Sequence, residues 1–300
     1  MLVSVILPIN NAESFIEEAL NSVFSQTYRN FELIAIDDGS TDSSLAILRR
    51  IVDNDKRVRV VAREKRGLIR TLNQGIDMAK GSLVARMDAD DICETWRLEC
   101  QVRFMGNNPS VVCVGGQIKL IDKCGREIMK MTMPLDHEVI DAANFSAVSH
   151  GVVHPTGMIR LSALKMIGGY RSVFRHAEDI DLWLRLAEIG SLANLPILLL
   201  KYRQHIESIG YKYRFEQKSS QWKAVKAAAL RRGHDFTFPQ PSSAEVEIKG
   251  ISGATEEKWA WWALKGGNMR TARYYAMRAL ATASWRFSVW KLALCCVRGR

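Results

Sequence analysis

Short apolar runs alternate with amphipathic segments through the N-terminal third of the chain. The aliphatic run Val3–Leu7 is typical of a strand buried on both faces, whereas Glu13–Gln26 repeats apolar residues at helical spacing. The same alternation predicts strands at Phe31–Ile36, Val58–Ala62 and Ser82–Met87, and helices at Asp42–Val52 and Leu68–Lys80. Repeated βα units predict an α/β fold with a mostly parallel, Rossmann-like sheet that binds ligands at the carboxyl ends of its strands.

The pattern changes near residue 97. We predict helices at Arg97–Met105, Ser162–Ile167 and Asp179–Ile189, strands at Val111–Gly116 and Pro196–Arg203, a hairpin through Asp122–Gly125 and a polar, irregular stretch before Arg160. Beyond residue 212 four helices are predicted, near 216–232, 255–265, 268–282 and 285–297. We therefore expect one α/β domain in two halves, 1–96 and 97–211, followed by a helical region at 212–300.

Length and composition are those of a globular protein. With 300 residues, 47% of them hydrophobic and 25% charged, the chain can bury a large core, and disordered or collagen-like classes are excluded. The first residues lack the basic region of a signal peptide, and no apolar run reaches the ~18 residues that span a bilayer. The six cysteines show no zinc-binding spacing, which favours reduced thiols. We expect a cytoplasmic protein, or one that attaches to the inner face of the cell membrane only at its surface.

Positive charge is concentrated in the last third of the chain. Residues 1–210 carry 25 Lys/Arg and 26 Asp/Glu, whereas 211–300 carry 17 and 6, so the net charge of +10 arises from the C-terminal region. The segment 258–300 has nine basic residues, no acidic residue and five of the eight tryptophans. Cations with aromatics suit a peripheral membrane contact, but a helical hairpin that packs on the α/β domain or on a second subunit stays open. Nucleic acid is the least favoured partner, because no nucleic-acid-binding motif accompanies the charge.

Three acidic clusters are candidates for chemistry. Asp88-Ala89-Asp90-Asp91 follows a predicted strand directly, and crowded carboxylates are ligands that Mg²⁺ or Mn²⁺ prefers. Asp37-Asp38 ends the second strand, where a carboxylate can bind a base or ribose hydroxyls. Glu178-Asp179-x-Asp181 opens a predicted helix, where a carboxylate can act as a general base. Each cluster has a structural alternative. The cluster at 88–91 can be a solvated acidic turn, and Asp37-Asp38 can belong to a turn beside the helix cap Ser40 or Thr41. The carboxylates at 178–181 can simply stabilise the N-terminus of their helix.

The order and spacing of these motifs resemble the inverting glycosyltransferases of family 2, which have the GT-A fold. The residues that carry the resemblance are VSVILPINNAESFIEEALNSVFSQTYRNFELIAIDDGSTDSS, GLIRTLNQGIDMAKGSLVARMDADD and HAEDIDLWLRLAEIG. The resemblance covers about residues 2–210. It implies an enzyme that moves a sugar from a nucleotide diphosphate donor, UDP-linked, to an acceptor hydroxyl in the synthesis of a cell-surface glycan or polysaccharide.

Matching positions imply roles for individual residues. Asp90, together with His205 near the diphosphate, is the implied ligand of Mn²⁺ or Mg²⁺. Asp179 is the implied catalytic base, and Glu178 helps to position the acceptor or donor sugar. The residues implied to bind the nucleotide sugar are Pro8, Asn11, Glu13, Asp38, Arg70, Asn73, Asp88 and Ala89.

The acceptor side is less well marked. In the family the segment Gly151–Arg160 faces the acceptor, so His154 is a candidate acceptor contact. Asp181, in the cluster that opens the helix at 179–189, is a second candidate. A buried structural position is the alternative for His154, and an exposed loop position is the alternative for His205. The family implies a glycan or lipid-linked acceptor and leaves the oligomeric state open.

The chain departs from the family pattern in three ways. Asn10 replaces the usual Tyr, which removes the ring that stacks on the base, and Glu64-Lys65-Arg66 replaces the usual Asn-containing approach to Gly67. The Q-x-x-R-W motif and the paired transmembrane helices of processive synthases are missing from the sequence, which favours single addition. A non-catalytic nucleotide-sugar-binding module and a nucleotidyltransferase are the alternatives. The expected carboxylates are all present and a glycine-rich phosphate loop is not, so both are less favoured.

Overall fold

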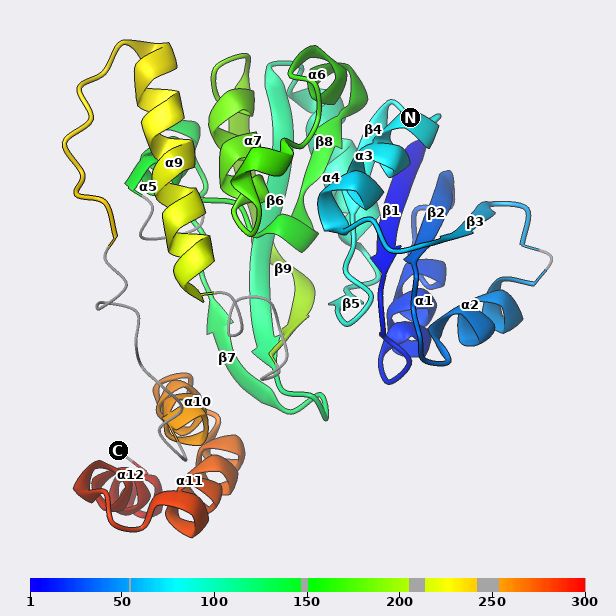
Figure 1. Cartoon of the computed structure of the whole chain (residues 1–300). Coiled ribbons are helices and arrows are strands. Elements are labelled where there is room, and N and C mark those ends of the chain that lie inside the picture. The colour runs from blue at the N-terminus through cyan, green and yellow to red at the C-terminus, as the bar shows by residue number, and fades with distance from the viewer. Residues whose placement is uncertain (54, 147–150, 205–213, 242–253, 300) are drawn as a thin grey trace. The chain divides into compact units, whose positions relative to one another are not determined.

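The computed structural model describes residues 1–53, 55–146, 151–204, 214–241 and 254–299 (Figure 1). The chain divides into two compact units. The larger comprises Met1–Gln117, Met133–Leu200 and Phe215–Pro241, and the smaller comprises Ile118–Thr132, Lys201–Arg214 and Ser242–Arg300. Across the described ranges, no helix is both long enough and apolar enough to cross a membrane.

A mixed sheet carries the fold, and its N-terminal part is parallel. The strands lie in the order β3-β2-β1-β4-β8-β6-β9-β5, and β7 pairs with β6. Neighbouring strands among β1 to β4 run parallel, whereas β8 is antiparallel to β4 and β6, and β7 is antiparallel to β6. Their bounds are β1 (Val3–Ile9), β2 (Phe31–Asp38), β3 (Val58–Arg63), β4 (Leu83–Arg86), β5 (Ile92–Cys93), β6 (Val111–Ile121), β7 (Glu127–Met131), β8 (Met158–Arg160) and β9 (Ser191–Arg203).

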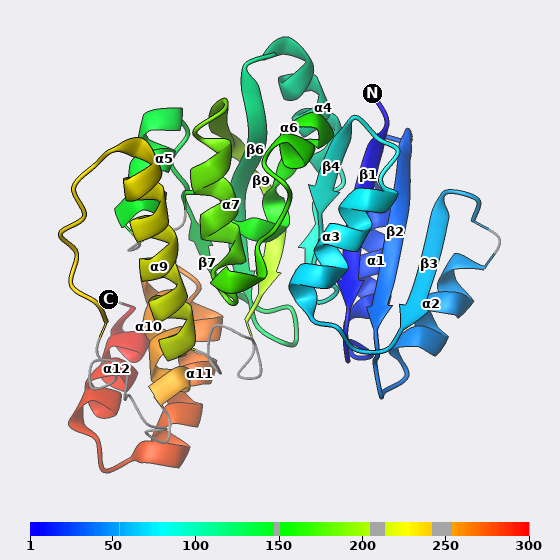
Figure 2. The same cartoon turned by 45° about the horizontal axis from the view of Figure 1, so that its top comes forward.

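Helices cover both faces of the sheet in the larger unit. Figure 2 shows α3 on one face and α1 and α2 on the other. This follows from the strand order, because right-handed crossovers put helices on opposite faces once the chain returns from β3 past β1 to β4. The prediction of an α/β fold is confirmed. The helices of this unit are α1 (Ile16–Phe24), α2 (Ser44–Val52), α3 (Leu68–Met78), α4 (Arg97–Asn107), α5 (His137–Ser146), α6 (Leu161–Met166), α7 (Glu178–Leu186) and α9 (Arg214–Arg232).

Several elements differ from the sequence prediction, among them β9, which begins at Ser191 and not at Pro196. β6 does not end at Gly116 but continues to Ile121, because Gly115 and Gly116 make room for neighbouring side chains. A Cβ on Gly115 would lie 2.4 Å from Asn194 Oδ1, and one on Gly116 would lie 2.5 Å from Leu199 Cδ1. The stretch before Arg160 is also not wholly irregular, since it contains α5, which packs against α7 and has too few apolar positions for a clear helical period.

The smaller unit holds the three C-terminal helices and β7. They are α10 (Ala254–Lys265), α11 (Met269–Ala283) and α12 (Phe287–Arg298), and they confirm the helices predicted from 255 onward. Trp259 of α10 meets Tyr275 of α11 edge to face at 5.1 Å, and Tyr275 donates a 2.7 Å hydrogen bond to Asp122 Oδ2. Aromatic packing and one buried polar link therefore tie α10 and α11 to the turn before β7.

Candidate donor-binding and catalytic site

Two loops at the carboxyl ends of β1 and β2 hold each other in place. Pro8 pairs with Ile36 in the parallel register, so the residues that follow these strands meet at one edge of the sheet. Asn10 Nδ2 donates to the carbonyl of Asp38 at 3.0 Å, and Asn11 Oδ1 accepts the Thr41 amide at 2.8 Å. Asn10, which stands in place of the family's Tyr, is therefore a loop-to-loop link.

Glu13 belongs to the same loop pair. Its carboxylate accepts the Ser43 amide at 2.9 Å, and its own amide donates to Asp42 Oδ2 at 3.1 Å. Asp42 Oδ1 accepts the Ser44 amide at 3.0 Å, so Asp42 and Glu13 cap α2. The expectation that Ser40 or Thr41 would cap this helix was wrong, because both of those residues bind Asn11 instead.

Asp38 is a buried carboxylate held by backbone amides. Its oxygens accept the amides of Arg66 at 2.8 Å and Gly67 at 2.7 Å, and Arg63 lies 3.1 Å from Oδ1. Gly67 has a φ of +89°, a left-handed conformation that favours glycine in this turn. A carboxylate offers about four lone-pair sites, so Asp38 retains acceptor capacity for a ligand at the strand edge.

The predicted contacts on α3 separate into two kinds. Arg70 is exposed in the first turn of the helix, where it can reach a ligand. Asn73 is turned toward the loop before α7: its Nδ2 donates to the Tyr170 carbonyl and its Oδ1 accepts the Tyr170 amide, both at 2.8 Å. Because both ends of the amide are engaged, this geometry favours a positioning role for Asn73 rather than direct contact with base or phosphate.

The acidic loop after β4 brings three carboxylates together. One oxygen each of Asp88, Asp90 and Asp91 lies within 4.8 Å of the others, with Ala89 buried between them. Arg86, the last residue of β4, forms an ion pair with Asp88. Burial raises the pKa of Asp88 to about 6. The positive charge of Arg86 opposes this rise, and the negative charge of Asp90 adds to it. This all-oxygen donor set fits a hard divalent cation such as Mn²⁺ or Mg²⁺.

The first turn of α7 carries the second carboxylate pair. Asp179 Oδ1 accepts the amide of Ile180 at 2.9 Å. Burial raises the pKa of Glu178 to about 7, with the charge of Asp179 adding to the effect and Arg86 opposing it. The charge of Arg86 thus acts on both Asp88 and Glu178, with Asp88 in direct contact, so the acidic loop and the start of α7 both lie within electrostatic range of one guanidinium.

Tyr170 is a site residue that the sequence reasoning missed. Its hydroxyl lies 2.8 Å from His154 Nε2, and the edge of Trp183 faces the His154 ring at 5.9 Å. Burial raises the pKa of Tyr170. The positive charge of Arg86 opposes this rise, and the negative charges of Glu178 and Asp179 add to it. No local pattern marks Tyr170, since it follows Gly168-Gly169 in an ordinary helix-ending turn.

His154 and Asp181 sit in different surroundings from those expected of acceptor contacts. His154 is buried, bonded to Tyr170 and in ring contact with Trp183 of α7. Asp181 is 1% exposed and binds Arg171 and Arg185, the latter at 2.7 Å, while Arg185 also donates to the carbonyls of Ile167 and Gly169. A carboxylate so enclosed is poorly placed to contact a sugar, and these ion pairs favour a positioning role for Asp181. His205 lies outside the described residues.

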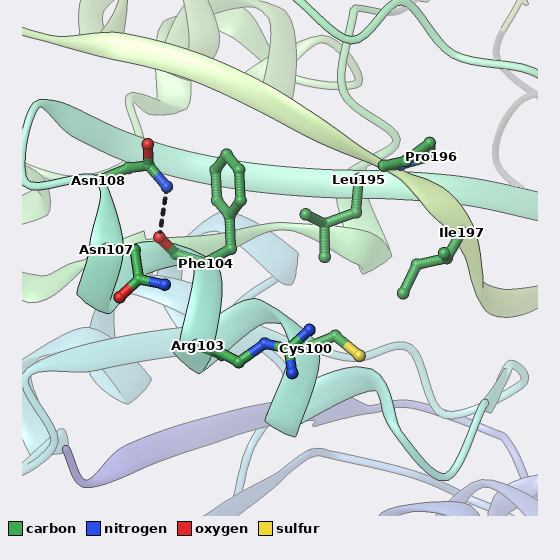
Figure 3. A pocket seen from close by; sticks show the side chains of 8 residues that line it. All are labelled: Cys100, Arg103, Phe104, Asn107, Asn108, Leu195, Pro196 and Ile197. Atoms are coloured by element: carbon green, nitrogen blue, oxygen red, sulfur yellow. Dashed lines mark hydrogen bonds between the residues drawn. The ribbon is translucent and has the colours of Figure 1, made fainter.

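A separate pocket of about 330 Å³ lies between α4 and β9 (Figure 3). It contains none of the predicted site residues, and its polar groups are few; Asn108 Nδ2, for example, already donates to the Phe104 carbonyl at 2.8 Å. Because the carboxylates converge elsewhere, this pocket is not the candidate active site. It is lined by Cys100, Arg103, Phe104, Asn107, Asn108, Leu195, Pro196 and Ile197.

The fold is the GT-A fold that is found in glycosyltransferases. Residues 1–349 of Staphylococcus aureus TarS in complex with UDP-GlcNAc superpose with a TM-score of 0.64 at 18% identity, covering 100% of this chain and 93% of that one. The Pyrobaculum calidifontis mannosyltransferase in complex with GDP-Man and Mn²⁺ has a TM-score of 0.57 at 21% identity, covering 99% and 79%.

The chain belongs to glycosyl transferase family 2, whose profile matches residues 4–168. It is 33% identical to an uncharacterized glycosyltransferase of Haemophilus influenzae over 73% of this chain and 70% of that one. It is also 33% identical to the O-antigen biosynthesis glycosyltransferase WbnJ of Escherichia coli, over 69% and 81%. The matched profile includes the acidic loop and ends before α7, so Glu178 and Asp179 rest on the geometry described above.

Proposed function

We propose that this chain transfers a sugar from a nucleotide diphosphate sugar, UDP-linked, to an acceptor hydroxyl with inversion, in the synthesis of a cell-surface glycan or polysaccharide. The observation that carries the proposal is the cluster of three carboxylates after β4, with the carboxylates of the first turn of α7 within electrostatic range of the same arginine, Arg86. The solved relatives in complex with UDP-GlcNAc and GDP-Man support the donor class. The O-antigen relative supports the glycan pathway and a glycan or lipid-linked acceptor.

The two halves of the α/β domain have different tasks in this proposal. The donor half, 1–96, presents the base and phosphates to the loops after β1, β2 and β4. The acceptor half, 97–211, contributes α7 and the buried pair His154–Tyr170, and the helical region 212–300 is an addition to it. The donor contacts are Pro8, Asn11, Glu13, Asp38, Arg70, Asn73, Asp88 and Ala89, with Asn73 acting through Tyr170.

Asp90 is the residue we propose as ligand of Mn²⁺ or Mg²⁺, with His205 as a second ligand. Asp90 lies in the acidic loop with Asp88 and Asp91, and one oxygen of each lies within 4.8 Å of the others. The bound ion supplies a Lewis acid for the charge that develops on the leaving diphosphate. Asp91 is buried, so we propose that it helps to hold the loop and does not contact the donor.

Asp179 is the proposed general base. It takes the proton of the acceptor hydroxyl while that oxygen bonds to the anomeric carbon and the bond from that carbon to the β-phosphate oxygen breaks. The nucleoside diphosphate leaves from the opposite face, so a single displacement inverts the anomeric centre. Because the pKa of Glu178 is raised, Glu178 can remain protonated near neutral pH and donate a hydrogen bond that positions a sugar.

Hydrolysis of the donor, with water as acceptor, tests the proposal without knowledge of the natural acceptor. Release of UDP from a panel of UDP-sugars is measured with and without Mn²⁺. Asp179→Asn is expected to lower turnover by about 10²–10⁴-fold while donor binding is kept, since only the proton transfer is removed. Asp90→Asn is expected to remove the response to Mn²⁺.

Asp136→Asn is the matched control, because Asp136 is an exposed carboxylate outside the site. Normal turnover by the Asp179→Asn protein would remove the base assignment. UDP release that ignores Mn²⁺ in the unmodified protein would remove the metal assignment.

A further inference from the structure

Helix α12 has apolar side chains on two opposite sides. Val289, Leu292 and Cys296 are buried within the smaller unit, where Val289 packs with Ala279 and Ala283 of α11. These residues are spaced three and four apart, which is the ordinary pattern of a helix that covers a core. The core contact therefore accounts for only one side of the helix.

The other side of α12 is an apolar stripe that faces solvent. It consists of Phe287, Trp290, Leu294 and Val297, which are 84%, 56%, 50% and 73% exposed. Their spacing of three, four and three residues puts all four on one face, opposite the buried one. Trp285, which precedes the helix, is 71% exposed as well. Clustered large apolar side chains of this kind mark an interaction surface rather than the scattered exposure of a normal surface.

Positive charge borders the apolar stripe. Lys291 follows Phe287 by four residues and Arg298 follows Leu294 by four, so both exposed cations lie at one edge of the stripe. From residue 258 onward the sequence contains no Asp or Glu. Glu257 precedes this segment and is already paired with Arg286 at 2.8 Å. The surface around the stripe therefore favours an anionic partner.

The charge also argues against a second copy of this chain as the occupant. Two copies that packed their stripes antiparallel would bring Lys291 and Arg298 to the same edge as those of the partner, where like charges repel. An anionic bilayer has the opposite charge and an apolar interior beneath its headgroups. α12 has twelve residues and is therefore about 18 Å long, short of the ~30 Å hydrocarbon core, so it would lie in the plane of the interface.

We propose that the apolar stripe of α12 docks this protein on the surface of an anionic lipid bilayer. Phe287, Leu294 and Val297 enter the boundary between headgroups and acyl chains, and Trp290 lies at headgroup level. Lys291 and Arg298 reach back to lipid phosphates. The proposal rests on α12 alone and does not depend on the transferase activity.

Flotation with phosphatidylcholine vesicles, with and without phosphatidylglycerol, tests the docking. The full-length protein is expected to float with the vesicles that contain phosphatidylglycerol and to be released by high salt, which screens the surface charge. Phe287→Ser with Val297→Ser is expected to lower the bound fraction at least about tenfold. Lys291→Glu with Arg298→Glu is expected to remove the preference for phosphatidylglycerol.

Matched controls come from the larger unit. Met166→Ser removes an apolar side chain that is 72% exposed, close to the 73% of Val297. Arg49→Glu with Lys165→Glu reverses two exposed charges. Both variants should float like the unmodified protein. Failure of the unmodified protein to bind anionic vesicles would overturn the proposal. So would a dimer in solution that becomes monomeric in the Phe287→Ser, Val297→Ser protein while vesicle binding persists.

Discussion

Arg86 is the residue that connects the acidic loop with the start of α7. Its side chain is buried at the end of β4, forms an ion pair with Asp88 and opposes the rise in pKa of Glu178 and Tyr170. Arg97 supports it from α4, with Nη2 donating to the Arg86 carbonyl at 2.8 Å. Crowded carboxylates raise one another's pKa, and the divalent ion that we propose would compensate their charge.

The raised pKa of Glu178 gives stability a predictable pH dependence. The folded-state pKa of about 7 exceeds the usual value of 4.5, so between those values the folded protein binds a proton that the unfolded chain has lost. The free energy of unfolding therefore falls as pH rises through this window. The glutamine of Glu178→Gln cannot ionise. We therefore expect the unfolding free energy of the variant, minus that of the unmodified protein, to be larger near pH 8 than near pH 4 by on the order of 1 kcal/mol or more.

Thermal melting at several pH values in metal-free buffer measures this difference. A gain on the order of 1 kcal/mol corresponds to about 2–4 °C in the midpoint. Glu138→Gln, at an exposed carboxylate on α5, is the control and should show no such pH dependence. An equal effect of Glu178→Gln at all pH values would mean that Glu178 does not titrate in this window.

At the scale of elements, α7 depends on the ion pairs of Asp181. Asp181 binds Arg171 and Arg185, and Arg185 holds the carbonyls of Ile167 and Gly169. These contacts fix the loop 167–171, which carries Tyr170, against the helix that carries Glu178 and Asp179. The first turn of α7, which carries the proposed base, is therefore held by ion pairs and hydrogen bonds on another part of the helix.

Asp181→Asn should destabilise the protein by about 3–5 kcal/mol, because it leaves the buried guanidinium of Arg185 without its counter-charge. Urea unfolding measures the change. Glu17→Gln is the control, since the Glu17–Arg50 pair is exposed on both sides and should contribute less than about 1 kcal/mol. A loss as small as that of Glu17→Gln would show that the Asp181 pairs do not hold α7.

At the scale of the whole molecule, the donor should stabilise the fold by mass action. We expect UDP-sugars with Mn²⁺ to raise the thermal midpoint, with a gain of about 2.7 kcal/mol at a ligand concentration 100 times the dissociation constant. A panel of UDP-, GDP- and other nucleotide sugars, each with and without Mn²⁺, measures both base and metal preference. Stronger stabilisation by GDP-sugars would contradict the proposed UDP donor, and no stabilisation by any member would contradict the donor class.

Local sequence determined the donor half closely. Strands β1 to β4 and helices α1 to α3 lie within a few residues of their predicted bounds, because each is long, periodic and ended by polar or glycine residues. The family could also be inferred from the order of the acidic clusters, and the matching profile confirms it. The acidic loop was found because three carboxylates next to a strand end are already unusual in the sequence.

Only the tertiary structure decided how these carboxylates are partnered. Pairing is a matter of distance between segments far apart in the chain: Asn73 meets Tyr170 across 97 residues, and Arg86 is set beside α7 by the fold. For the same reason the sequence predicted Asp181 as an acceptor contact, whereas in the structure Asp181 is buried and paired with two arginines. Tyr170 lies near the predicted site residues although no local sequence pattern marks it. The sequence shows that the residues of the α12 stripe are apolar. Which of its two apolar faces is exposed depended on the contact with α11, because burial is a property of packing and not of residue type.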